Sequence, residues 1–205
     1  MQKEINKHRI DMRSKKAFTL IELLTVIAII GILAGILIPT VSSVKTSANK
    51  AKTKAQFGQW SVAMGLFKNE YGYYPVIHTS NLIASAKFAG ALTGRTLAGV
   101  KSATDGNTKS LSFYSIADNE LNEAKTSLVD AFGNTEIAVF TDTTGDGVVN
   151  ASDGAFVPVK GPETGDASAT PDLPSGGVRA GVVFYSAGKG GSPTATVKAN
   201  IVTSW

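Results

Sequence analysis

The chain has 205 residues, a length that suits one modest globular domain together with a membrane segment. It contains no cysteine, which excludes a disulfide framework. Residues 1–17 hold six of the 20 basic and two of the 16 acidic residues, so the rest of the chain is charge-balanced and lacks the net positive charge that draws proteins onto nucleic acid.

A long apolar run follows this basic leader. Between Ala17 and Val44 the sole charged residue is Glu22, in a stretch rich in Ile, Leu and Val. At about 1.5 Å per residue, a helix over residues 18–44 is roughly 40 Å long, which is enough to cross a hydrocarbon core of about 30 Å. The run predicts a membrane segment, a helix buried in a helical assembly, or each in turn. A secretory signal would have a shorter apolar core, and a plain signal anchor would leave Glu22 unexplained.

The start of the run carries a family resemblance. The residues Ala17-Phe18-Thr19-Leu20-Ile21-Glu22-Leu23-Leu24 resemble the class III signal of type IV pilins and type II secretion pseudopilins. This resemblance implies that a prepilin peptidase cuts between Ala17 and Phe18 and methylates the new amine of Phe18. The family usually has Gly before the cut, where this chain has another small residue, Ala17.

Glu22 requires a physical explanation, because a carboxylate inside a membrane helix costs about 2.5–3.5 kcal/mol on insertion scales. The resemblance implies a partner, the free amine of Phe18 on a neighbouring subunit, and their attraction would set the axial register of a filament. The alternative is that Glu22 lies at the bilayer edge and reaches water.

Three further residues inside the run are candidates for assembly. Gly31 and Gly35 form a GxxxG pattern that lets helices approach closely in lipid, or else they only weaken the helix. Pro39 removes a backbone donor and predicts a kink or a local opening. In the family a proline here often marks a stretch that unwinds on assembly.

The charges flanking the run predict orientation. The leader acts as a positive-inside signal, so we expect a single-pass inner-membrane protein with its globular domain in the periplasm. Lys45, Lys50, Lys52 and Lys54 follow the run and partly oppose this orientation. We expect them to form a solvated helix face; binding of DNA or anionic lipid is the alternative.

The helical pattern continues to about Glu70. An apolar stripe recurs at spacings of three, four or seven, widened by Phe57, Trp60, Met64 and Phe67, and this stripe should lie on a sheet. The stripe consists of Val41, Val44, Ala48, Ala51, Ala55, Val62 and Leu66. Gly72 and Pro75 are stop signals.

The remaining chain predicts a small antiparallel sheet of about three or four strands. A short helix is expected over residues 82–92 with a stop at Gly94, a loop over 101–109, and a strand or turn with a helical piece over 111–128. Strands are expected over 135–141, 155–160, 178–186 and 194–204, with a loop over 161–177. The fold class is therefore α+β and pilin-like: a long amino-terminal helix, transmembrane in its first half, packed on a small antiparallel sheet. The expected organisation is a cleaved leader 1–17, a membrane or filament-core helix 18–39, its amphipathic continuation 40–70, and a globular domain 71–205.

Two stretches of the carboxyl-terminal half add to the resemblance. Residues 128–134, LVDAFGN, are similar to the Asp-Pro-Trp-Gly-Asn stretch of the major pseudopilin of type II secretion, with Ala131 and Phe132 as departures. Residues 183–188, VFYSAG, resemble the family's strand that ends in Ser-x-Gly.

One segment has the spacing of a calcium loop. Residues 142–153, DTTGDGVVNASD, place oxygen-bearing side chains at loop positions 1, 3, 5, 9 and 12 and Gly147 at position 6. The expected Ca²⁺ ligands are Asp142, Thr144, Asp146, Val148 through its carbonyl, Asn150 and Asp153. The pattern most resembles the loop of dockerin-type repeats. The alternative is an Asp-Gly hairpin turn that needs no metal.

These observations favour a structural subunit of a type II secretion pseudopilus over an adhesive or DNA-uptake minor pilin. The resemblance implies other pseudopilins, the prepilin peptidase, an inner-membrane assembly platform and the membrane as partners. We expect no nucleic-acid partner. We also expect no enzyme, because His78 is the only histidine after the leader and a nucleophile with its base is hard to assemble.

Overall fold

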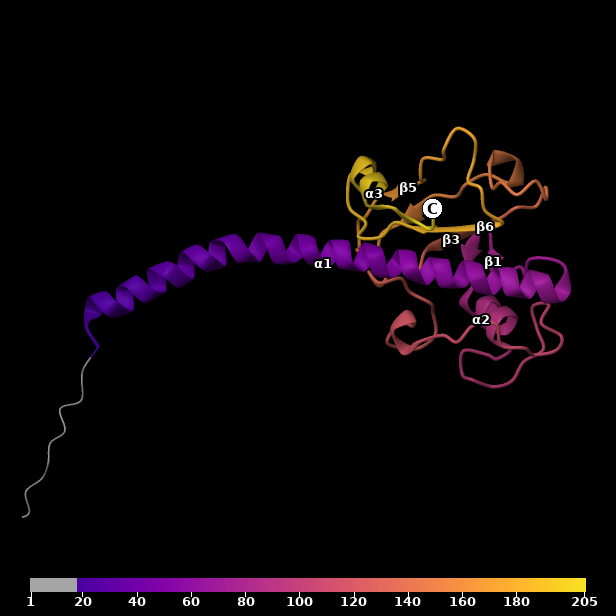
Figure 1. The fold of residues 1–205 in the computed structure, drawn as a ribbon, viewed down its shortest axis with the longest axis horizontal. Helices are drawn as coiled ribbons and strands as arrows, with labels where there is room; N and C mark the ends of the chain where they lie inside the picture. The colour runs from indigo at the N-terminus through magenta and orange to yellow at the C-terminus, as the bar shows by residue number, and fades with distance from the viewer. Residues whose placement is uncertain (1–17) are drawn as a thin grey trace, which may run out of the picture. The chain divides into compact units, whose positions relative to one another are not determined.

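The computed structural model describes residues 18–205, without the side chain of Pro39. The predicted leader, and with it Ala17 of the expected cleavage site, lies outside the described residues. The chain divides into an amino-terminal unit that ends at Val44 and a compact unit, Lys45–Trp205. The elements in chain order are α1 (Leu20–Tyr71), β1 (His78–Thr79), β2 (Leu82–Ile83), α2 (Ser85–Thr93), η1 (Asp118–Glu120), β3 (Ile137–Thr141), η2 (Ala151–Asp153), β4 (Val159–Lys160), β5 (Ser168–Ala169), β6 (Val182–Ser186), α3 (Thr194–Asn200) and β7 (Val202–Thr203) (Figure 1).

The long helix α1 ends as the stop signals predict. Its last residue is Tyr71, and Gly72 follows with φ of 83°. The N–H of Gly72 donates to the carbonyl of Lys68 at 2.7 Å, which satisfies a carbonyl of the last turn. A residue with a Cβ would be strained at this left-handed position.

The residues that widen the predicted stripe form the buried face of α1, whereas the other members of that stripe are exposed. Phe57, Trp60 and Phe67 are fully buried. Val62 and Leu66, by contrast, are 64% and 47% exposed. The remaining members of the predicted stripe are exposed as well: Val41, Val44, Ala48, Ala51 and Ala55. Aromatic rings bury more apolar surface than Val, Leu or Ala, so they decide which side of the helix meets the domain.

The sheet is five-stranded and antiparallel, with the order β1-β2-β3-β6-β7, so it is larger than predicted. Its centre is the β3–β6 pair, whose register runs from Ile137 opposite Ser186 to Thr141 opposite Val182. Successive residues of β3 face opposite sides. Ile137 and Val139 belong to the core shared with α1 and α2, and the residues between and after them belong to a second core.

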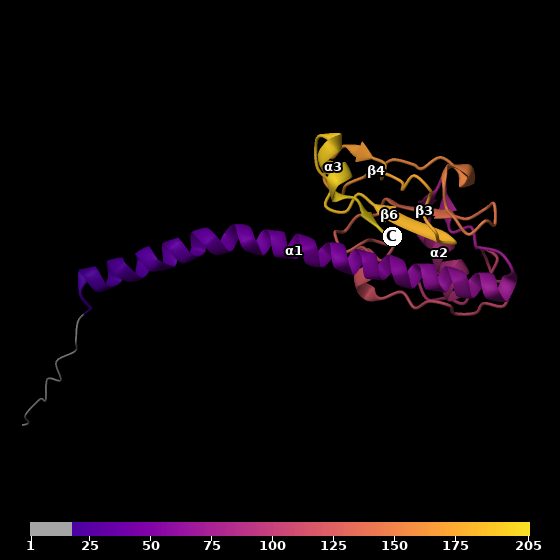
Figure 2. The ribbon, with the colours of Figure 1, turned by 45° about the horizontal axis from the view of Figure 1, so that its top comes forward.

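The second core lies on the far side of the sheet from α1. There α3 and the segment between β3 and β6 cover the strands (Figures 1 and 2). The fold is thus α+β, a long amino-terminal helix packed on a small antiparallel sheet, as predicted. One pair of aromatic rings in each core illustrates the packing. Trp60 lies 4.8 Å from Phe88 of α2, and Phe140 stacks on Phe156 at 4.2 Å between ring centroids.

Four local predictions are corrected. The expected strand 194–204 is a helix, α3, followed by the short strand β7. Val197 is the one buried residue of α3, so this stretch has no alternating apolar face to place in a sheet. The expected loop 161–177 contains β5, which pairs with β4. The expected helix 82–92 begins with β2 instead, and α2 ends at Gly94 with φ of 64°. Residues 111–128 contain the short 3₁₀ turn η1 and an isolated bridge between Leu121 and Leu128.

Candidate functional site

The first half of α1 exposes an apolar surface around its whole circumference. Every Ile, Leu and Val from Leu20 to Val44 is at least 49% exposed. The helix is long and apolar enough to cross a membrane, by length and composition. A helix that is apolar all round is stable in lipid or among other helices, and not in water. The amino-terminal unit therefore has the character of a single membrane anchor.

Glu22 caps the amino-terminal end of this helix. Its Oε2 accepts a hydrogen bond from the backbone N–H of Thr19 at 2.8 Å and another from the Thr19 hydroxyl at 2.7 Å. The N–H of Glu22 in turn donates to the Thr19 hydroxyl at 3.3 Å. This reciprocal pattern is a capping box, in which the two side chains satisfy backbone donors that an isolated helix end leaves free. The sequence signal, Thr followed three residues later by Glu, was present, but the prediction for Glu22 did not use it.

The other assembly candidates lie along the exposed surface. Phe18 precedes the helix and is 79% exposed. No described atom lies within 4 Å of a Cβ built on Gly31 or Gly35, so both positions are open for the close approach of another helix. Helix α1 continues through Pro39, and the predicted opening at that residue stays a prediction.

The acidic loop 142–153 folds back on itself. Oδ1 of Asp142 accepts the N–H of Gly145 at 2.6 Å, and Oδ2 accepts the N–H of Gly147 at 2.8 Å. The Thr144 hydroxyl donates to Asp142 Oδ1 at 3.2 Å. At the other end, Asp153 accepts the N–H groups of Thr144 and of Asn150. The structure therefore brings Asp142, Thr144, Asn150 and Asp153 together.

Asp146 and Val148 are placed differently. Asp146 is exposed, and its Oδ1 accepts the N–H of Val148 at 2.8 Å. Within residues 18–205, no three His, Cys, Asp or Glu side chains are placed as ligands of one metal ion. The loop thus supplies two carboxylates and one hydroxyl close together, and a cation would also need backbone carbonyls and a turn of Asp146 toward the others.

Hydrogen bonding keeps the two inner carboxylates of the loop ionised. Removal from solvent acts to raise the pKa of Asp142, but hydrogen bonds from Gly147, Gly145 and Thr144 hold that pKa below its ordinary value, although the charge of Asp153 opposes them. The pKa of Asp153 is lowered in the same way, with burial opposed by N–H groups of Asn150, Thr143 and Thr144. Both groups are charged at neutral pH, as a hard cation requires.

A buried contact joins the two carboxyl-terminal motifs that carry the family resemblance. The Ser186 hydroxyl, at the end of β6, donates to Asp130 Oδ2 at 2.6 Å. The other oxygen of Asp130 accepts the N–H groups of Phe132 and Asn134. Burial raises the pKa of Asp130, and these hydrogen bonds oppose the rise. The turn over residues 128–134 is therefore fixed to the strand over 182–186 by one side-chain pair.

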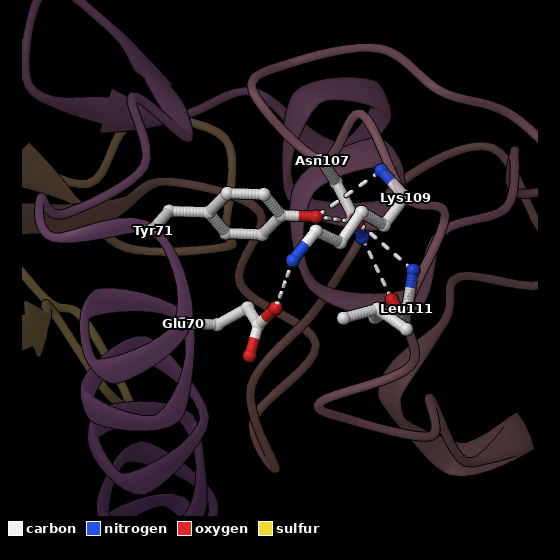
Figure 3. Close-up of polar contacts among 5 residues, drawn as sticks. All are labelled: Glu70, Tyr71, Asn107, Lys109 and Leu111. Atoms are coloured by element: carbon white, nitrogen blue, oxygen red, sulfur yellow. Dashed lines mark hydrogen bonds and ion pairs between the residues drawn. The ribbon is translucent and has the colours of Figure 1, made fainter.

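A second polar cluster fixes the loop 101–111 to the end of α1 (Figure 3). Asn107 is fully buried and donates to the carbonyls of Ala91 at 2.8 Å and Leu111 at 2.7 Å. Its Oδ1 accepts the Tyr71 hydroxyl and the N–H of Leu111, each at 2.9 Å. Lys109 forms an ion pair with Glu70. Sequence patterns do not predict this cluster, because its members come from three separate segments.

Comparisons with known proteins agree with the amino-terminal features. Residues 12–38 match the family model described as the prokaryotic N-terminal methylation motif. A search of curated proteins and a search of solved structures each returned no significant match. The motif implies processing by a prepilin peptidase and assembly into a pilus-like filament. The matched residues include the first part of the exposed apolar helix α1, and the motif and the helix together support a type IV pilin-like amino terminus.

Proposed function

We propose that this protein is a structural subunit of a type II secretion pseudopilus, a type IV pilus-like filament that supports protein export. The observation that carries the proposal is the exposed apolar helix from Leu20 to Val44, most of which lies within the matched methylation motif of residues 12–38. Lipid buries this apolar surface before assembly, and the same helices of neighbouring subunits bury it in the filament. The role is mechanical, and we propose no catalytic function for the chain.

Assembly requires a guide to axial register, and we propose that Glu22 provides it. In the uncleaved chain its Oε2 caps the helix through Thr19. Cleavage before Phe18 creates an amine one residue before Thr19. We propose that Glu22 then binds the amine of Phe18 on a neighbouring subunit, because opposite charges attract strongly in a medium of low dielectric constant. The positive ends of helix dipoles at the same level favour a carboxylate there.

The choice of a secretion filament over a pilus is supported by the carboxyl-terminal half. The chain has no cysteine, whereas many type IV pilins carry a disulfide near the carboxyl end. The Asp130–Ser186 contact joins the two motifs that resemble the major pseudopilin. The alternative is a minor pilin of an adhesive or DNA-uptake system, which would require an exposed ligand-binding patch on the globular unit.

The proposal is tested in the protein's own cells with three variants. Glu22→Ala is expected to insert into the membrane and to be cleaved before Phe18, but not to co-sediment as polymer. Glu22→Asp is the charge-retaining control and should keep part of the assembly, and Thr19→Ala separates loss of the cap from loss of the charge. Wild-type-like filaments from Glu22→Ala would refute the role of the acid. Loss of secreted proteins on deletion of the protein supports secretion, and loss of surface pili alone supports the alternative.

We also propose that the loop 142–153 binds Ca²⁺. Asp142 and Asp153 are ionised and lie on facing parts of a turn whose spacing matches a calcium loop. Calcium is expected to raise the melting temperature of the full chain in detergent, and Asp146→Ala is expected to remove that shift. Asp172→Ala, which removes an exposed acid outside the loop, should leave the shift intact. An equal melting temperature in calcium and in chelator would overturn the assignment.

A further inference from the structure

Lysines surround α1 where the apolar run ends. The first charge after Glu22 is Lys45, directly after Val44, and Lys50, Lys52 and Lys54 follow within three turns. Helix α1 contains no acidic residue between Glu22 and Glu70. Four positive charges are thus gathered on one short helical segment, and no carboxylate of the same segment neutralises them. We call these four residues the lysine collar.

The collar encircles the helix. At 100° per residue, Lys45 and Lys52 share one side, while Lys50 and Lys54 share another side that is roughly opposite. Lys50 and Lys54 donate to backbone carbonyls of the carboxyl-terminal segment, those of Ala199 at 3.3 Å and Trp205 at 3.0 Å. These bonds leave each ammonium group with further donors. A positive charge therefore lies on both sides of the helix.

The collar has no acidic partner in the described part of the chain. The three ion pairs of residues 18–205 are Lys109–Glu70, Lys125–Asp118 and Lys198–Asp172. The ammonium groups of Lys45 and Lys52 make no hydrogen bond within these residues, and both side chains are exposed. The charge of the collar is therefore available to a partner of opposite sign.

The composition of the collar favours lipid over protein as that partner. Protein interfaces are enriched in aromatic residues and Arg and depleted in Lys at their centres. Here the charges are all Lys, and α1 has no aromatic residue before Phe57. The side chains between the lysines are small, chiefly Ser, Thr and Ala. A protein partner would meet one patch of the helix, whereas headgroups reach each side that the compact unit leaves open. Here that is the side of Lys45 and Lys52, while Lys50 and Lys54 lie beside the carboxyl-terminal segment.

The height of the collar agrees with this partner. The apolar run from Leu20 to Val44 is about 37 Å long as a helix, against roughly 30 Å of hydrocarbon core and about 5–7 Å of headgroup on each side. Lys45 thus lies at the level of the headgroups. Lys50 lies about 7 Å and Lys54 about 14 Å farther along the helix, so Lys45 and Lys50 are within roughly one Debye length of each other and Lys54 lies beyond it.

We propose that the lysine collar binds anionic phospholipid headgroups of the bilayer and so holds the subunit in an anionic lipid shell before assembly. This inference rests only on insertion of the apolar helix into a membrane, and not on the identity of the filament. The positive-inside rule disfavours lysines on the expected periplasmic side of the span. The proposal gives these lysines a role there, because after translocation they hold the helix end at the anionic headgroups.

The test uses the full chain, whose lack of cysteine makes single-site labelling direct. Ser47→Cys, at an exposed position within the collar, carries a donor fluorophore. The labelled protein is reconstituted in phosphatidylcholine discs with a minority of phosphatidylglycerol. Energy transfer is then measured to a trace acceptor on either lipid. Wild type should transfer more to labelled phosphatidylglycerol than to labelled phosphatidylcholine, and the preference should fall in high salt.

Matched double variants decide the outcome. Lys45→Gln with Lys52→Gln should lower the preference, by roughly fivefold per lysine at low salt. Lys101→Gln with Lys160→Gln removes the same charge from exposed lysines outside α1 and should leave the preference unchanged. Equal transfer to the two lipids in wild type would overturn the proposal, as would equal losses in both double variants. If the collar variant instead lowers self-association in discs of pure phosphatidylcholine, with no lipid preference in wild type, the partner is an acidic surface of a second copy. Failure to insert into discs would overturn the membrane anchor as well, which separates the two claims.

Discussion

Replacement of Asn107 by Ala is expected to destabilise the compact unit more than any surface substitution of similar size. Asn107 is fully buried and makes four short hydrogen bonds, two as donor and two as acceptor. Its partners come from three segments: the end of α1, the end of α2 and the loop after Asn107 itself. Removal of the amide leaves the Tyr71 hydroxyl and the carbonyls of Ala91 and Leu111 without this partner.

The magnitude follows from these contacts. Each hydrogen bond contributes about 1 kcal/mol net, and a buried group left unsatisfied costs about 1–3 kcal/mol. Because Leu111 is exposed and part of the loop can rehydrate, we expect Asn107→Ala to lower the free energy of unfolding by about 3 kcal/mol. For a unit of this size that corresponds to a melting temperature lower by about 6–12 °C. Tyr71→Phe removes one of the four bonds and also the acceptor of the Lys109 N–H, so it should cost about 1–2 kcal/mol.

Thermal unfolding of the full chain in detergent, followed by circular dichroism, measures the effect. Hydrogen exchange at the amides of Lys109 and Leu111 should accelerate, since their acceptors are the Tyr71 hydroxyl and Asn107 Oδ1. Asn119→Ala, at an exposed position, is the control and should change the free energy of unfolding by less than about 0.5 kcal/mol. If Asn107→Ala lost no more stability than Asn119→Ala, the cluster would not hold the loop.

Asp130 and Asp153 should affect the free energy of unfolding with opposite pH dependence. The buried ring of Trp60 should affect it strongly. The pKa of Asp130 is raised in the folded state, so its protonated form stabilises the fold. This contribution to the free energy of unfolding is complete below the unfolded pKa of about 3.9 and is lost as the pH rises through the folded pKa. The stability of wild type relative to Asp130→Asn should therefore fall between pH 3.5 and neutrality; a rise would contradict the assignment. The pKa of Asp153 is lowered, so wild type should exceed Asp153→Asn in stability near pH 6 and lose that advantage as the pH falls below about 3.9, as measured by urea unfolding. Trp60→Ala should lower the free energy of unfolding by about 3–5 kcal/mol, because the ring is fully buried between Phe57, Phe88 and Phe184, and a loss below 1 kcal/mol would place the core elsewhere.

The sequence predicts the long helix and the central strands well, because the signals for these elements are strong and lie within each element. The apolar run that begins after the basic leader and the Gly stop define α1 without reference to any other element. The central strands β3 and β6 are likewise short runs rich in Val, Ile, Phe and Tyr. These runs are buried on both faces, because α1 covers one side and α3 with the preceding segment covers the other.

The failures have a common cause, which is tertiary context. Spacing alone does not distinguish the exposed Val62 and Leu66 from the buried Phe57 and Trp60, since all four fit a helical period. The side of α1 that packs on the sheet is the side with the larger aromatic rings. Residues 194–200 have a composition rich in Thr and Ala that fits strand or helix, and only the covered second core makes them α3. The Asn107 cluster depends on side chains 36 positions apart and has no local signal.

The central claim is that a cleaved, apolar helix leaves lipid to join copies of itself, guided by Glu22. The most direct measurement is mass spectrometry of the amino terminus together with sedimentation of the protein from its own cells, for wild type and Glu22→Ala. The account predicts that both chains begin at a methylated Phe18 and that wild type alone is recovered as polymer. A wild-type protein that retains residues 1–17 and never sediments as polymer would contradict it.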